Sequence, residues 1–208
     1  MCTLFHRKDE DGFLRSLAER AEASRLAAKF RRAGKAVAGA GDIRPTDVVA
    51  VLAPGRDGEK AVFPMQWGFR LPGGGLVVNA RTETAAAKPL FADPWARRRC
   101  LVPASWYCEW AHETDSSGRK RVGAKYRIGA GDGSRLMLCG LYRMEEGLPV
   151  FSVLTRAPTA DLARLHDRMP LILPEELADA WTRPATHAED LLPHARTDLF
   201  AAVCAAGE

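Results

Sequence analysis

Cys100-Leu101-Val102-Pro103-Ala104-Ser105-Trp106-Tyr107-Cys108-Glu109-Trp110 is the stretch that decides the fold of this chain. Its apolar and aromatic residues predict a β-strand, with Pro103 at a sheet edge or in a bulge because proline has no amide hydrogen for the ladder. Similar short runs occur on both sides of it, at residues 48–52, 61–69, 76–80, 124–128, 136–142, 149–154 and 171–173. So many short strands predict a barrel-like, mostly antiparallel β core.

Helices are expected around this core. Residues 11–34 repeat apolar side chains every three to four positions up to Gly34, which predicts one amphipathic helix. Shorter helices are expected at residues 82–88, 159–165, 175–181 and 189–192. With no internal repeat and no long linker, residues 1–208 are predicted to form a single α+β domain.

The composition excludes some classes of protein. No apolar run approaches the roughly 20 residues that a membrane helix needs, and the beginning lacks a signal-peptide pattern. The five cysteines show no disulfide-framework or metal-site spacing. We therefore expect a cytoplasmic protein that is associated with the nucleoid when it binds DNA. We also expect a monomer with no metal and no cofactor. The net charge of +4 permits an anionic partner without requiring one.

Met1-Cys2 carries the most distinctive chemistry. Removal of an initiator Met before a small residue would leave Cys2 with a free amine and a thiol on neighbouring carbons. These groups titrate near ~7.7–8.0 and ~8.5, so both are partly nucleophilic at neutral pH. Such a pair captures an aldehyde twice, first as an imine and then as a five-membered thiazolidine. Residue 2 also tolerates many amino acids, so Cys2 alone does not establish this function.

Polar residues occur at three places where the pattern favours apolar ones. Asn79 and Arg81 lie at the end of a predicted strand, where an amide and a guanidinium can hold a substrate hydroxyl and a phosphate. The alternative is a structural Asn and an Arg81–Glu83 pair. Glu109 lies between Cys108 and Trp110, and its partial desolvation should raise its pKa towards the range for proton transfer.

The third place is His166, just before Pro170, with an intrinsic pKa suited to acid–base chemistry. A lone histidine is more often structural. The aromatic residues Trp106, Tyr107 and Trp110 fit a core, but beside the arginines at 97–99 they also fit a platform on which single-stranded bases stack.

Together, several segments in this order resemble the SRAP family, the SOS-response-associated peptidase domain, over nearly the whole chain. They are Cys2, residues 79–84, residues 99–104, Glu109-Trp110 and residues 166–170. The chain departs from the common family pattern at Thr3, Leu4 and Cys108. The resemblance implies a barrel-like α+β fold and an enzyme that crosslinks itself to ring-opened abasic sites in single-stranded DNA.

The resemblance also implies roles for individual residues. Cys2 would be the trap, exposed by an aminopeptidase or by self-processing of Met1, with Asn79, Glu109 and His166 as its catalytic partners. Glu109 would accept and return protons, and His166 would protonate the sugar oxygen. DNA contacts are expected from a further set of residues, namely Arg81, Arg99, Trp67, Trp106 and Arg168.

Two other functions remain open from the sequence. Cys2, His166 and Glu109 would also serve a thiol peptidase that cleaves other proteins. The arginines and tryptophans alone would serve a non-covalent single-strand binding module.

Overall fold

A closed barrel of five strands forms the centre of the computed structural model, which describes residues 2–114 and 117–204. The hairpin of β12 and β13 pairs on one side with β9 and on the other, in parallel, with β5, and β4 joins β5 to β9 and so closes the ring. The barrel strands are β4 (Val48–Pro54), β5 (Lys60–Trp67), β9 (Arg99–Ala104), β12 (Leu136–Glu145) and β13 (Leu148–Arg156).

Short strands extend the barrel at its rim. β8 runs parallel to β13 and β2 runs parallel to β4, whereas β14 and β15 pair antiparallel with β13 and β12. A separate two-stranded ribbon consists of β6 and β7. The bounds are β2 (Val37–Ala38), β6 (Phe69–Arg70), β7 (Leu76–Val77), β8 (Asn79–Arg81), β14 (Met169–Pro170) and β15 (Ile172–Leu173).

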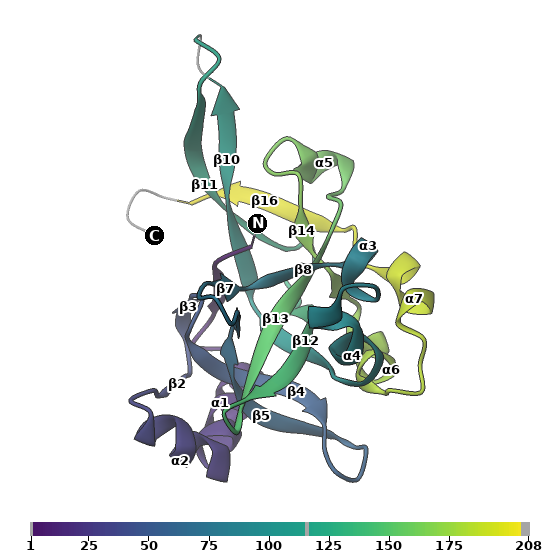
Figure 1. Cartoon of the computed structure of the whole chain (residues 1–208). Coiled ribbons are helices and arrows are strands. Elements are labelled where there is room, and N and C mark those ends of the chain that lie inside the picture. The colour runs from purple at the N-terminus through teal and green to yellow at the C-terminus, as the bar shows by residue number, and fades with distance from the viewer. Residues whose placement is uncertain (1, 115–116, 205–208) are drawn as a thin grey trace.

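A second, five-stranded antiparallel sheet packs beside the barrel, in the order β16-β11-β10-β1-β3. Its β10–β11 hairpin projects well beyond the rest of the molecule (Figure 1). The strands are β1 (Phe5–Arg7), β3 (Gly41–Ile43), β10 (Trp106–Thr114), β11 (Lys120–Ala130) and β16 (Leu199–Val203). A polar hairpin-like connection is expected from the sequence at residues 112–121; residues 112–114 and 120–121 belong to the two strands, and residues 115–116 lie outside the described part of the chain.

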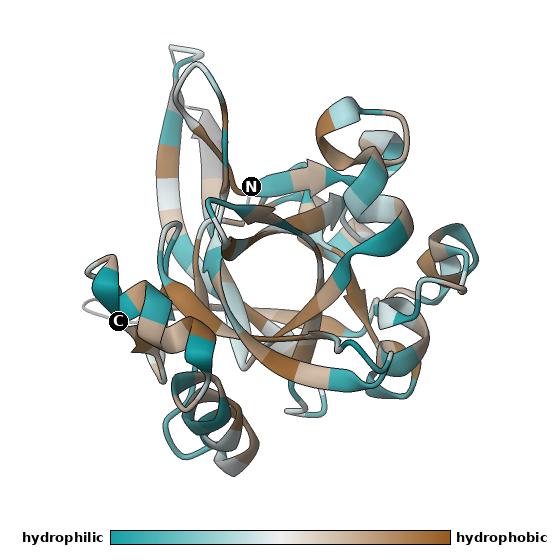
Figure 2. Cartoon of the chain, turned by 60° about the horizontal axis from the view of Figure 1, so that its bottom comes forward, coloured by the Kyte–Doolittle hydropathy of each residue, from teal (hydrophilic) through white to brown (hydrophobic). Residues whose placement is uncertain are grey.

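Helices lie around the outside of the barrel (Figures 1 and 2). They are α1 (Gly12–Glu22), α2 (Arg25–Arg32), α3 (Thr82–Ala85), α4 (Pro89–Arg97), α5 (Ala160–Ala163), α6 (Ala178–Thr182) and α7 (Ala188–Leu191), with 3₁₀ turns η1 (Glu175–Leu177) and η2 (Leu192–His194). The single helix expected at residues 11–34 was wrong. Ser24 accepts the N–H of Ala27 as an N-cap and starts a second helix.

Two apolar clusters hold these layers together. One fills the barrel and the space beneath the second sheet, with Val51, Val102 and Phe151 among its members. The other lies between the barrel and its helices and includes Trp95 and Trp181, whose rings meet edge to face. This arrangement confirms the predicted α+β fold with a barrel-like, mostly antiparallel core.

The stretch 100–110 does not form one strand. It leaves the barrel at the end of β9 and enters the second sheet at the start of β10, with Ser105 between them. Pro103 lies inside β9 opposite Met137, and the ladder with β4 contains only the pair Leu52–Leu101. The buried Arg7 donates from Nε to Pro103 O at 3.0 Å and from Nη2 to Ala50 O at 2.6 Å, so its guanidinium bonds carbonyls where the proline has no N–H to offer.

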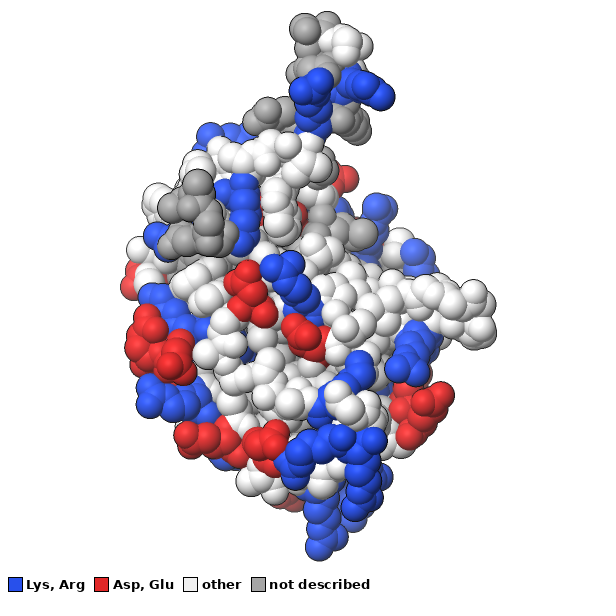
Figure 3. All heavy atoms as spheres, turned by 90° about the vertical axis from the view of Figure 1, so that its left-hand side faces the viewer, with Lys and Arg blue, Asp and Glu red and all other residues white. Residues whose placement is uncertain are grey.

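Charged side chains are unevenly distributed. Figure 3 shows basic groups on the projecting hairpin and at the end of the molecule that carries α2, with acidic and basic groups mixed between them. Helix α2 carries the basic residues Lys29, Arg31 and Arg32 in its last turn. In the part of the chain that the structure describes, no helix is both long and apolar enough to cross a membrane.

Candidate active site at the N-terminal strand

Pairing between β1 and β10 brings the beginning of the chain to Glu109. Phe5 lies opposite Tyr107, and the N–H of Cys108 donates to Leu4 O at 2.9 Å. Continued by two residues, this antiparallel register places residue 3 opposite Glu109. The N-terminal segment is therefore held beside the one acidic residue of the stretch 100–110.

Cys2 is fully buried beside this strand. Its main-chain carbonyl accepts a hydrogen bond from Asn79 Nδ2 at 2.8 Å, and its Sγ lies 3.8 Å from Leu4 O. Burial raises the pKa of the Cys2 thiol far above its usual range, and the Glu109 carboxylate raises it further. At neutral pH, Cys2 is therefore a thiol rather than a thiolate in this structure. Met1 lies outside the described residues.

Asn79 reaches Cys2 from a rim strand of the barrel. β8 lies alongside β13, with Asn79 opposite Val153 and Arg81 opposite Thr155. Arg81 is exposed two residues farther along the same strand, so it lies on the same side of the strand as Asn79. The alternative Arg81–Glu83 pair is absent from the contacts of the described residues, because Glu83 binds Arg168 instead.

Glu109 is only 4% exposed, and burial raises the pKa of its carboxyl group to about 7. Its predicted desolvation is thus confirmed. Tyr107, two residues earlier on the same face of β10, is buried next to it, and burial together with Cys2 and Glu109 raises the Tyr107 pKa. Sequence reasoning placed Tyr107 in the core or on a base-stacking platform and not in the site, although the two-residue period of a strand places it beside Glu109.

His166 approaches the site from the segment between α5 and β14. Its Nδ1 accepts the N–H of Arg168 at 3.0 Å, which places the proton of a neutral ring on Nε2. The same Nδ1 lies 2.7 Å from Asp167 Oδ1, so a protonated ring gains an ion pair. Asp167 also raises the pKa of Glu109 through its negative charge, which brings this segment within electrostatic reach of the carboxyl group.

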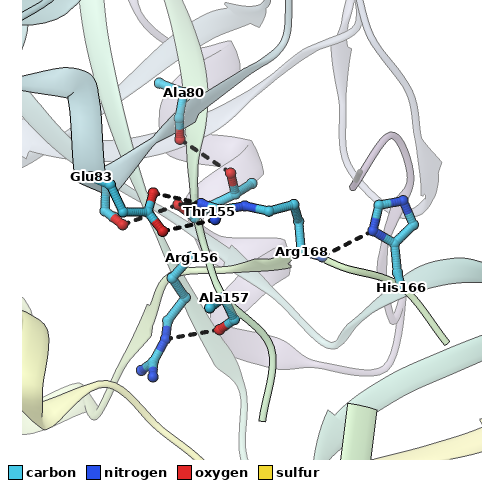
Figure 4. A network of polar contacts seen from close by, with 8 residues as sticks. Ala80, Glu83, Thr155, Arg156, Ala157, His166 and Arg168 are labelled. Atoms are coloured by element: carbon cyan, nitrogen blue, oxygen red, sulfur yellow. Dashed lines mark hydrogen bonds and ion pairs between the residues drawn. The ribbon is translucent and has the colours of Figure 1, made fainter. Parts of the chain in front are cut away.

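Arg168 connects the His166 segment to neighbouring elements through its side chain (Figure 4). Its guanidinium forms two bonds with the Glu83 carboxylate, at 2.7 and 2.8 Å, and donates to Thr155 O at 2.7 Å. These bonds hold the pKa of Glu83 at about 2. The Arg168 side chain therefore joins α3, β13 and the His166 segment, and the DNA contact expected of it stays a prediction.

Two other expected DNA contacts lie in the interior. Trp67 is fully buried between Phe5 and Phe151, and its Nε1 donates to Val78 O at 2.9 Å. Arg99 is buried against Trp181, and its guanidinium donates to backbone carbonyls of the C-terminal helices and of α4. Neither side chain presents a surface to a ligand, which corrects the expectation. Trp106 is half-buried on the opposite face of β10 from Glu109.

The described residues include no group of three or more His, Cys, Asp and Glu side chains arranged to hold a metal ion. The structure thus brings together a thiol, an amide and a carboxyl group of raised pKa, and the charge of Asp167, next to His166, reaches that carboxyl group. This set can transfer protons to and from a substrate bound at Cys2.

Comparisons with known proteins match most of the chain. A family model described as "SOS response associated peptidase (SRAP)" matches residues 1–203. The abasic site processing protein YoaM of Bacillus subtilis is 29% identical over 186 residues, which is 77% of this chain and 78% of that protein. YedK of Escherichia coli, also described as an abasic site processing protein, is 30% identical over 149 residues, 68% of this chain and 64% of that protein.

A third relative, the abasic site processing protein YoqW of Bacillus subtilis, is 31% identical over 143 residues, which is 62% of this chain. The match spans only 60% of the length of YoqW.

Solved structures share the fold. A phage-related protein from Bordetella bronchiseptica superimposes with a TM-score of 0.70 at 24% identity, covering 98% of this chain and 94% of that one. A protein from Bacteroides thetaiotaomicron gives a TM-score of 0.69 at 19% identity, covering 96% and 91%.

Proposed function

Because this chain belongs to the SRAP family, we propose that it processes abasic sites in DNA by crosslinking itself to the ring-opened sugar. The link forms at Cys2 once Met1 has been removed. The substrate is single-stranded DNA, in which the sugar aldehyde is accessible, and Arg81 holds a flanking phosphate. Removal of Met1 by the protein itself is one route to the active form.

The proposed reaction has two steps. The amine of Cys2 adds to the aldehyde carbon, and loss of one water leaves an imine. The Cys2 sulfur then attacks the imine carbon while its proton passes to the nitrogen, which closes the thiazolidine. Overall, one water is lost and both the C–N and C–S bonds remain.

The observation that carries the proposal is the position of Glu109 against Cys2. A carboxyl group with a pKa of about 7 is partly ionised at neutral pH, so it can take a proton from the Cys2 ammonium and later return one. Asn79 holds the Cys2 main chain, which fixes the direction of the amine. The His166 imidazole, with Asp167 available to stabilise its charged form, serves as the acid that protonates the departing oxygen.

The state of the Cys2 thiol favours aldehyde capture over a thiol peptidase. A peptidase nucleophile attacks as a thiolate, whereas burial here raises the thiol pKa. In the crosslinking reaction the amine attacks first, and the sulfur adds only to an imine already held next to it.

An extension of the N-terminus separates the candidate functions. A Gly-Ser segment that is retained before Cys2 converts its amine into an amide. We expect this protein to form no stable adduct with an oligonucleotide that carries one abasic site. A matched protein, in which a protease removes the same segment to leave Cys2 first, should regain the adduct. Crosslinking by the extended protein would contradict the amine-first reaction.

A further inference from the structure

The outer face of the second sheet carries aromatic side chains on both sides of a glycine. Trp106 pairs with His6 of β1, and Gly129 of β11 pairs with Phe200 of β16. Because Tyr107 lies opposite Ile128, the same register places Trp106 opposite Gly129. A single row thus crosses four strands in the order His6, Trp106, Gly129, Phe200. It lies on the opposite face of β10 from Glu109 and plays no part in the proposed crosslinking.

One face of the Trp106 ring is covered and the other is turned to the glycine. His6 stacks on Trp106 with ring centres 4.2 Å apart and planes 4° apart. Since β10 lies between β1 and β11 and His6 stacks from β1, we infer that the other face of the indole lies on the β11 side, toward Gly129 and the approaching Arg127. A flat aromatic group placed there would continue the existing stack.

The surface of the sheet next to Trp106 carries no side chain at Gly129, which lies opposite Trp106 on β11. A Cβ at Gly129 would meet the Trp106 Cβ at 3.8 Å, an ordinary contact, so this position has space that the sequence leaves empty. Phe200 leans over Gly131, where an added Cβ would lie 2.7 Å from its ring, and 71% of the Phe200 side chain is exposed. The resulting cavity measures about 430 Å³, within the usual range for small-ligand sites.

Basic side chains line this cavity next to Trp106. Lys8 Nζ and the Arg127 guanidinium lie 5.6 and 5.8 Å from the centre of the Trp106 ring. Neither has an ion-pair partner among the described residues. Arg135 also lines the cavity but is paired with Asp11, and Glu10 is the other acidic residue in its wall. Two available cations beside an aromatic ring match a planar base with its phosphate better than an uncharged apolar partner.

We propose that the slot between Trp106 and Phe200, floored by Gly129, binds a nucleobase of single-stranded DNA outside the crosslinking site, with Lys8 and Arg127 on the adjoining phosphates. The choice of DNA as ligand rests on the proposed function. The chemistry of the slot itself, base stacking plus phosphate binding, does not depend on Cys2 or on an abasic site.

The test uses an undamaged oligothymidylate labelled with a fluorophore and followed by anisotropy. Gly129→Val fills the slot with a residue that suits a strand, and Phe200→Ala removes one wall at an exposed position. We expect each to weaken binding roughly tenfold, the size of one lost base stack. Val203→Ala is the matched control, because Val203 is on the same strand and 60% exposed but lies on the other face.

The salt dependence of binding tests the phosphate contacts proposed for Lys8 and Arg127. Lys8→Ala and Arg127→Ala should each lower the slope of log Kd against log salt concentration by somewhat less than one unit, as expected for one phosphate contact in a single strand. Crosslinking of each variant to an abasic trinucleotide, too short to span both faces, should match the parent protein and shows that the fold is intact.

Unchanged oligothymidylate affinity in both Gly129→Val and Phe200→Ala would overturn the proposal. So would equal affinity for thymidine monophosphate and the oligonucleotide, which would make a free nucleotide the ligand. A loss of self-association in the variants, with DNA binding intact, would also overturn it and assign the slot to a second copy of this chain. Failure of crosslinking in the parent, with slot-dependent binding retained, would contradict only the proposed function.

Discussion

Asn79 donates from Nδ2 to the main-chain oxygen of Cys2 at 2.8 Å, across 77 positions of sequence. This bond fixes the residue whose amine and thiol are proposed to react. Asn79→Ala should slow adduct formation about 10- to 100-fold, because the nucleophile is no longer held in one direction. It should cost only about 1 kcal/mol of unfolding free energy. Single-turnover crosslinking and urea unfolding check the two parts, and an unchanged rate would remove Asn79 from the site.

The raised pKa of Glu109 predicts a specific dependence of the unfolding free energy on pH. The folded-state pKa of Glu109, about 7, lies above its value in the unfolded chain. The contribution of Glu109 to the unfolding free energy is therefore full below about pH 4.5 and is lost as the pH rises through 7. Between pH 5 and 8, the parent should lose roughly 2–3 kcal/mol more unfolding free energy than Glu109→Gln. Glu146→Gln, at an exposed carboxylate, should follow the parent. Parallel curves for the parent and Glu109→Gln would contradict the raised pKa.

Asp167 should set the pH range of the reaction. Its charge raises the pKa of Glu109, and its carboxylate lies 2.7 Å from His166 Nδ1. Asp167→Asn should therefore move the Glu109 limb of the pH–rate profile for crosslinking to lower pH and reduce the maximal rate. A lower rate with an unshifted profile would mean that Asp167 acts only on His166.

Arg7 should contribute to stability rather than to catalysis. Arg7→Lys keeps the charge but cannot bond both Pro103 O and Ala50 O with a planar guanidinium, leaving a buried carbonyl unpaired. We expect a loss of about 2–4 kcal/mol in urea unfolding. Arg20→Lys on helix α1 is the matched control and should change stability by less than about 0.5 kcal/mol. Equal stability of the two variants would contradict the bridging role.

Local patterns predicted the elements better than their connections. The apolar strands and the desolvation of Glu109 follow from residue types and two-residue alternation. The split of helix 11–34 at Ser24 was missed because the apolar spacing continues across it, although serine is a common N-cap. Strand β16 was also missed, since its residues pair with β11 from the far end of the chain.

The candidate site could likewise be predicted only in part from local sequence patterns. Cys2, Asn79 and Glu109 converge as the sequence predicts, but the paths of β1 and β8 that bring them together depend on long-range pairing. Trp67 and Arg99 are conspicuous residues whose burial no local pattern reveals, because an arginine bonded to several carbonyls looks the same in sequence as an exposed one. The effect of Asp167 on Glu109 arises only in the folded chain, whereas the two-residue strand period already places Tyr107 beside Glu109.

Intact-mass spectrometry after incubation with a single-stranded oligonucleotide carrying one abasic site tests the central claim most directly. The account predicts a starting mass without Met1 and a heat-stable adduct equal to protein plus DNA minus one water. Cys204→Ser should form the same adduct, since Cys204 lies away from Glu109, in a pocket that it lines together with His6 and Trp106. Cys2→Ala should form none that survives heating. A heat-stable adduct in Cys2→Ala, or its absence in a parent protein that has lost Met1, would contradict the account.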